Sequence, residues 1–372
     1  MVMPNVFVPE VDGFEYYKKL LRTKNDPNYQ ILLNSTRVVG VWDDHDYGLN
    51  NGGIDFKYKD RNQQFFLDFL DEPKFSPRRA RKGIYEAYYI GEPKLVKVLL
   101  LDVRYSNNHM TGDVLGQEQW NWLDEQLSEY SPLLYVIASG MQIIPDNKPG
   151  AETWPAESKQ KLYELIKKNE ASVLLLSGDI HQSEFLTHPC SQKLVGYDLV
   201  EFTSSGLTMG FGHGLPVIGE LFNTLIDDTY STSKDRYQEK NYGIIEIELN
   251  ENKLSESIIT LNQHGLNTLN KPIQQRKYQL KDFQKKLVLK DESSCVLNDG
   301  STNIERMINH IPKSLYKEII VNKHYDQGVI ILAILGGITF VLWFYCWLFK
   351  IITGIYKLRD EKKARKPKQK KQ

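Results

Sequence analysis

The stretch VVGVWDDHDYG, residues 38–48, places four ionisable side chains directly behind an apolar run. The three valines and Trp42 predict a strand that enters a core, because β-branched and aromatic residues suit a half-buried pleated surface. The ionisable side chains that follow are Asp43, Asp44, His45 and Asp46. Three carboxylates this close repel one another unless a cation or hydrogen-bond donors neutralise them. The stretch therefore indicates either a metal site at the end of a strand or an acidic surface turn that contains a histidine.

Helical periodicity and apolar runs alternate along most of the chain. Apolar residues three and four apart predict helices over 14–21, 62–70, 117–127 and 158–166. Apolar runs predict strands that begin near Leu95, Leu133, Ser172, Tyr197 and Gly243, most of them too continuously apolar to lie on a solvated sheet face. This alternation predicts an α/β domain whose sheet is covered by helices.

Polar side chains cluster just past the ends of these predicted strands, in groups at 102–104, 139–142, 177–181 and 203–205. In open α/β sheets, ligands bind at that edge. Within Gly178-Asp179-Ile180-His181, the aspartate and the histidine are two residues apart, so both can reach one cation. Such a pair alone is more often simply hydrogen-bonded. Together with the acidic stretch at 43–46, it favours a metal site.

Five motifs carry a family resemblance: WDDHDYG at 42–48, LLLDVRY at 99–105, LGQEQWNWLDEQL at 115–127, LSGDIH at 176–181 and EFTSSGLT at 201–208. In this order they resemble the PhoD-like alkaline phosphatase and phosphodiesterase family of metallophosphatases over roughly residues 15–250. The resemblance implies a double β-sheet sandwich flanked by helices. It also implies a two-metal site at the strand ends that hydrolyses phosphate monoesters or diesters. The ions would be iron, calcium, manganese or zinc, all of which accept oxygen and histidine ligands.

The resemblance also implies roles for particular residues. In the family pattern Gly-Asn-His-Asp/Glu, Asp44 takes the Asn place and the next two residues match. In the closing Gly-His-x-His pattern, Asp takes the place of the first His. The hypothesis is that the metal ligands are Asp44, Asp179 and His181. The catalytic residues would be His45, which contacts the phosphoryl group and assists the leaving oxygen, Asp46, which sets the tautomer of that histidine, and Arg104, which clamps phosphate.

Arg104 could equally form a structural salt bridge. Supporting positions around the site are predicted for Asp43, Asp102 and Gln142. Ordinary loop histidines are predicted at His109, His188 and His213.

Residues 328–349 contain no charged residue and are about as long as a membrane-spanning helix. Aromatic residues crowd the end of this run, and residues 350–372 hold ten basic and two acidic residues, whereas residues 1–349 carry an excess of eight acidic ones. The pattern predicts a single-pass membrane protein with a cytosolic tail lying against anionic lipid and an extracellular or lumenal domain. A tail-anchored cytosolic protein is the alternative. The acidic body argues against nucleic-acid binding.

The predicted organisation is a metallophosphatase domain at 1–263, a polar stalk at 264–327, the membrane helix at 328–349 and the basic tail at 350–372. No signal peptide precedes the domain, and the Asp-x-His and Gly-Asp ligand motifs expected before residue 42 are not found. Both observations predict an N-terminally truncated chain. A membrane-anchored domain that keeps the fold and binds a partner or an anionic ligand without catalysis is therefore the alternative function. Cys190 and Cys295 could pair or stay free, and Asn34 lies in a glycosylation sequon.

Overall fold

The computed structural model describes residues 13–92, 95–146, 152–210, 230–266, 268 and 271–286. A seven-stranded sheet has the order β1-β2-β3-β4-β6-β5-β7, and a three-stranded antiparallel sheet has the order β10-β9-β8. The strands of the larger sheet are β1 (Glu86–Ile90), β2 (Val96–Leu100), β3 (Leu134–Ala138), β4 (Val173–Ser177), β5 (Ser183–Thr187), β6 (Val200–Ser204) and β7 (Arg236–Tyr237). Those of the smaller sheet are β8 (Asn241–Glu248), β9 (Ile258–Gly265) and β10 (Gln274–Gln279).

The four central strands β2, β3, β4 and β6 run parallel. Their carboxyl ends therefore meet at one edge of the sheet, and the polar groups that follow them in sequence are brought together there. The remaining strands of this sheet, β1, β5 and β7, pair antiparallel to their neighbours.

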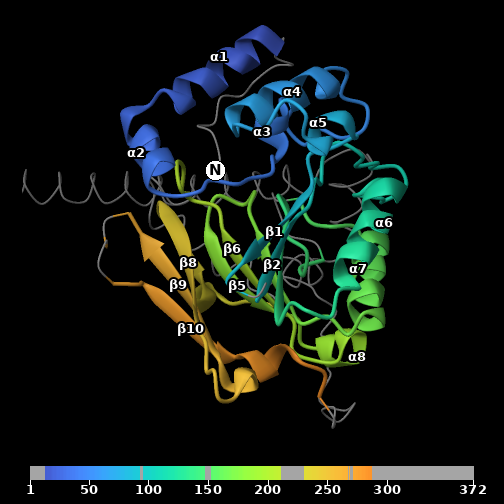
Figure 1. The fold of residues 1–372 in the computed structure, drawn as a ribbon, viewed down its shortest axis with the longest axis vertical. Coiled ribbons are helices and arrows are strands. Elements are labelled where there is room, and N and C mark those ends of the chain that lie inside the picture. The colour runs from blue at the N-terminus through green and yellow to red at the C-terminus, as the bar shows by residue number, and fades with distance from the viewer. Residues whose placement is uncertain are drawn as a thin grey trace, which may run out of the picture. The chain divides into compact units, whose positions relative to one another are not determined.

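The described residues also form helices. They are α1 (Gly13–Lys24), α2 (Pro27–Ser35), α3 (Asp44–Tyr47), α4 (Lys59–Phe69), α5 (Pro77–Ala80), α6 (Gly116–Leu127), α7 (Ala156–Lys168) and α8 (Ser191–Val195). In Figure 1, α6, α7 and α8 lie along one side of this sheet and β8–β10 lie on the other. The apolar stripe of α7 explains its place, because Leu162, Tyr163 and Ile166 are buried in the same cluster as the side chains of β2, β3 and β4.

A second apolar cluster holds the N-terminal helices together. Trp42 is fully buried and packs edge-on against Tyr47, with ring centroids 5.0 Å apart, and against Phe66 of α4. Tyr16 and Leu20 of α1 join this cluster. The cluster fixes α3, and with it the acidic stretch that follows Trp42.

The four predicted helices and the five predicted strands that begin near Leu95, Leu133, Ser172, Tyr197 and Gly243 are confirmed within a few residues. The prediction of a strand over 38–42 is wrong, since this segment is irregular and pairs with no strand of the described residues. The buried guanidinium of Arg78 instead donates a 2.6 Å hydrogen bond to the carbonyl oxygen of Gly40.

The predicted fold class needs a correction in its membrane helix, while the mixed α/β arrangement of sheets and helices agrees with the prediction. A helix needs about 20 apolar residues to cross the hydrocarbon core of a bilayer. Among the described residues no helix is both long enough and apolar enough to do so, and the longest, α7, has 13 residues. Residues 328–349 lie outside the described part of the chain.

The segment from residue 264 onward, predicted to be a stalk, begins instead as part of the fold. β10 pairs with β9 through six residues, and Leu280 and Phe283 just after it are buried in the main core. The polar composition of this segment reflects β10 itself, whose side chains are half-buried or exposed.

Candidate metal centre and active site

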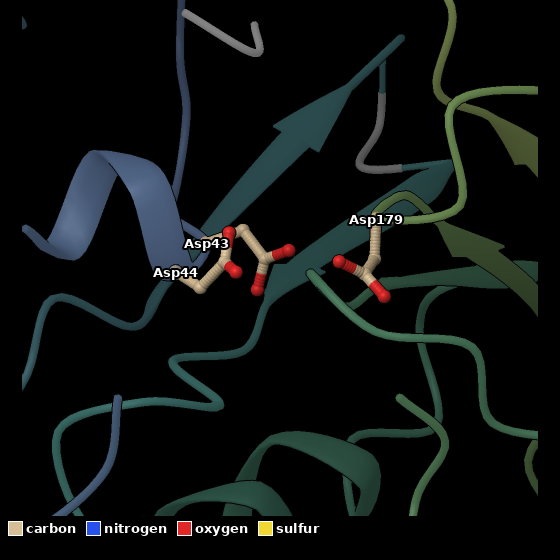
Figure 2. Close-up of side chains that lie close together, drawn as sticks. All are labelled: Asp43, Asp44 and Asp179. Atoms are coloured by element: carbon tan, nitrogen blue, oxygen red, sulfur yellow. The ribbon is translucent and has the colours of Figure 1, made fainter. Parts of the chain in front are cut away.

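Three carboxylates converge at the edge of the larger sheet, and we call them the carboxylate cluster: Asp43, Asp44 and Asp179. Each offers one oxygen, and these oxygens lie within 4.8 Å of one another. Figure 2 shows the first two side chains at the start of α3 and the third facing them from the turn after β4. The cluster therefore joins segments that are far apart in the chain.

The turn that carries Asp179 has unusual backbone geometry. Asp179 and His181 have φ angles of 72° and 53°, a left-handed conformation that is costly for residues other than glycine. Two hydrogen bonds hold the turn: the Gly178 amide donates to the Gly140 carbonyl oxygen at 3.0 Å, and the His181 amide donates to Ser205 Oγ at 3.3 Å. Conformations of this kind collect at functional sites, where the surrounding structure enforces them.

Backbone amides orient the second carboxylate. Asp44 Oδ1 accepts from the His45 amide at 2.6 Å, and Asp44 Oδ2 accepts from the Asn51 amide at 3.1 Å. The ring Nε2 of His45 lies 3.9 Å from Asp44 Oδ1, and the His45 side chain keeps 21% of its surface exposed. Burial, with a further contribution from the nearby His45 ring, lowers the pKa of His181. Two imidazoles thus lie beside the cluster.

Arg104 supplies the positive charge of this region. Its fully buried guanidinium donates from Nε to Asp43 Oδ1 at 2.7 Å and from Nη1 to Glu152 Oε2 at 2.6 Å. Burial alone would lower the pKa of Arg104, but these two carboxylates raise it above its ordinary value. The loop that carries Arg104 is held by Asp102, whose Oδ1 accepts from the amides of Arg104 and Tyr105. In this structure Arg104 therefore makes the contacts of a structural salt bridge, which was the alternative to a phosphate clamp.

One guanidinium does not balance the carboxylates around it. Burial raises the pKa of Asp179 to about 8, and the neighbouring carboxylate of Asp43 adds to the rise while Arg104 opposes it. Burial likewise raises the pKa of Asp43. A cation would relieve this excess of negative charge, and carboxylate oxygens are the ligands that hard cations prefer. The donor set therefore fits a metal ion.

Only some of the predicted site residues belong to the carboxylate cluster. Asp44 and Asp179 belong to the cluster, whereas His181 lies beside it and is not part of that group. The predicted contact between Asp46 and His45 is not among the hydrogen bonds of the described residues: Asp46 lines a pocket with Val41 and Phe66, and its buried Oδ1 has no hydrogen-bond partner. Burial raises its pKa to about 7.

The sequence reasoning gave too little weight to Asp43 and missed Glu152. Asp43 stands in the first motif, but only the fold shows that its carboxylate faces Asp179. Glu152 bonds Arg104, and its amide donates to Asp179 Oδ2 at 3.2 Å. No strand end or motif marks this glutamate, so the sequence carried no signal for it.

The other predicted histidines differ in their surroundings. His188 is buried between the rings of Tyr163 and Tyr230. His109 is exposed, with its ring 3.2 Å from the Asn51 carbonyl oxygen, and His213 lies outside the described residues.

Comparison with known proteins gives a family match and matches among solved structures. The family model described as PhoD-like phosphatase matches residues 10–258. A solved structure described as "Structure of PhoD" is similar with a TM-score of 0.53 and 14% sequence identity, which shows a shared fold. The match covers 84% of this chain, and this chain spans 66% of that one. None of the curated proteins matches significantly.

Proposed function

Because the chain belongs to the PhoD-like phosphatase family, we propose that it hydrolyses phosphoric esters with a metal ion held by the carboxylate cluster. The observation that carries the proposal is the convergence of three carboxylate oxygens within 4.8 Å beside two histidines. Burial and the neighbouring carboxylates raise the pKa values of Asp43 and Asp179, and this supports the proposal because a bound cation would stabilise their charged forms. The substrates are phosphate monoesters or diesters.

Different residues have different roles in the proposed hydrolysis. The carboxylate cluster holds the ion, which when bound lowers the pKa of a water molecule and neutralises phosphoryl oxygens. His45 is partly exposed beside Asp44, so it can hold the proton that the leaving oxygen needs. Arg104 keeps Asp43 in place, since two of its nitrogens already bind carboxylates, and this supports a positioning role over a direct phosphate clamp.

The test compares hydrolysis of p-nitrophenyl phosphate and bis(p-nitrophenyl) phosphate by the full chain, stripped with chelator and reloaded with calcium, manganese, zinc or iron. Metal-dependent turnover is expected to fall about 100-fold or more in Asp44→Asn and Asp179→Asn, because each loses an ionised ligand. Asp55→Asn is the matched control, an exposed aspartate outside the cluster. Unchanged turnover in Asp179→Asn would contradict the proposal. A wild-type chain that binds metal but hydrolyses neither ester would favour the non-catalytic binding domain.

The number of ions is part of the proposal. The carboxylate cluster accounts for one ion, and a second would need ligands such as His45, His181 or Glu152 beside it. Two metal atoms per folded chain by elemental analysis would support the two-metal centre. A single atom, lost in Asp179→Asn, would limit the centre to one.

We also propose that the domain lies in an oxidising compartment, outside the cell or in a lumen. The support is that Cys190 is disulfide-bonded, since disulfides are rare in the reducing cytosol. Cys295 and Cys346 lie outside the described residues. Blocking free thiols in native extracts before mass spectrometry tests this: a Cys190 thiol that reacts without prior reduction would contradict it.

A further inference from the structure

One face of β6 carries polar residues that the proposed reaction does not use. Glu201, Thr203 and Ser205 alternate along the strand and its extension, so they point to the same side. All three are buried. Ser205 accepts from the His181 amide, which ties this face to the turn that carries Asp179.

Glu201 binds the loop that follows β3, residues 139–144. Its Oε1 accepts from the Ile143 amide at 2.9 Å and its Oε2 accepts from the Ile144 amide at 2.7 Å. The side chain is fully buried, so water does not compete for these bonds. The carboxylate therefore fixes two consecutive peptide units.

Thr203 binds the same loop at Gln142, the residue before Ile143. Gln142 Nε2 donates to Thr203 Oγ1 at 2.9 Å and to Glu184 Oε2 at 2.8 Å. Thr203 pairs in register with Ser177 of β4 and with Glu184 of β5, so the contacts form a row across three strands. Arg236 of β7 extends the row by donating to Glu184 at 2.6 Å.

Two contacts link this loop to the candidate metal centre. Gly140 belongs to it and lies directly against the carboxylate of Asp43. On the far side, the Trp154 amide donates to the Gln142 carbonyl oxygen at 2.9 Å, which anchors the chain two residues after Glu152. Glu152 in turn binds both Arg104 and Asp179.

We infer that Glu201 is a positioning residue for the metal centre, because it holds the loop that places Gly140 against Asp43 and Glu152 against Arg104. The inference rests on the proposed function for its role in hydrolysis, but the same role extends to metal binding. Glu201 touches neither substrate nor metal in this role. Loss of the hydrogen bonds from this loop to Glu201 leaves all the metal ligands present but no longer held in their positions.

The test uses the full chain with Glu201→Gln, which keeps the size of the side chain and replaces one acceptor oxygen with a donor that faces an amide. Glu201→Asp keeps both oxygens and is expected to restore part of the loss. Phe202→Leu is the matched control: Phe202 is the next residue, on the opposite face, buried and stacked on Phe185 at 4.7 Å. It weakens the core without touching the loop.

Four quantities are measured on each variant: thermal stability, hydrogen exchange of the Ile143 and Ile144 amides, the Mn²⁺ dissociation constant and kcat for p-nitrophenyl phosphate. Glu201→Gln is expected to exchange faster at both amides, bind Mn²⁺ more weakly and lose about tenfold or more in kcat, the scale of a small misplacement. Phe202→Leu is expected to lose stability while its Mn²⁺ affinity and kcat stay at wild-type values.

Wild-type Mn²⁺ affinity in Glu201→Gln would overturn the inference, as would an equal loss of affinity in Phe202→Leu at the same stability. If the wild-type chain proves inactive on esters, the proposed function fails. Mn²⁺ affinity and amide exchange then still decide the role of Glu201, so the two failures are distinguishable.

Discussion

Replacing Gly140 with alanine is expected to displace Asp43 from the candidate metal centre. A Cβ atom on Gly140 would lie 2.4 Å from Oδ1 and 2.7 Å from Cγ of Asp43. A Cβ atom essentially never approaches another heavy atom closer than 3.0 Å, so it must separate from Asp43 Oδ1 by at least 0.6 Å, the difference between 3.0 Å and 2.4 Å. Asp43 cannot move freely, because its Oδ1 also accepts the 2.7 Å hydrogen bond from Arg104.

The size of the effect follows from what this displacement breaks. A hydrogen bond between charged groups contributes about 1.5–3 kcal/mol, and its loss changes an equilibrium constant about 10- to 100-fold. A misplacement of about 1 Å at a catalytic site costs about 100-fold in rate. Gly140→Ala is therefore expected to lower metal affinity and kcat/KM by about 10- to 100-fold.

The assay is metal-dependent hydrolysis of p-nitrophenyl phosphate together with Mn²⁺ titration. Gly40→Ala is the control, because a Cβ there meets only Leu70 Cδ2 at 3.6 Å, an ordinary contact. Both variants lose a glycine, so they share any effect on the unfolded chain. Wild-type metal affinity and kcat/KM in Gly140→Ala would refute the close packing of this loop against Asp43.

Two further predictions concern stability. Arg104→Gln leaves Asp43 and Glu152 without their shared counter-charge, so it should destabilise the metal-free protein by about 3 kcal/mol, read from denaturant unfolding; an unchanged midpoint would contradict this. His188 should make the protein acid-sensitive: burial lowers its pKa to about 4, so between pH 6.5 and 4 only the unfolded chain binds the proton. Stability should fall by about 3 kcal/mol as pH drops through that window, and unfolding measured against pH should show a shallower slope in His188→Gln.

The periodicity of the sequence predicted the elements that carry the site. Strands β2, β3 and β4 were visible as apolar runs, because strands buried on both faces contain few polar residues. The order of the strands was not visible, since pairing between distant runs leaves no local pattern. The run at 38–42 had the composition of a strand and formed none, because a strand also needs a partner, which composition does not show.

The candidate site, like the fold, was predictable from the sequence only in part. By itself, the sequence predicted two stretches of the candidate site, 43–46 and 178–181, from carboxylates and histidines that follow apolar runs, but not the segment that carries Glu152. Only the tertiary structure decided which side chains face one another. The packing of Trp42 and Tyr47 holds α3 so that Asp43 and Asp44 face Asp179, while Asp46 lines a pocket with Phe66. A one-residue change of phase in a short helix redirects every side chain, and that phase is decided by packing between segments that are distant in the chain.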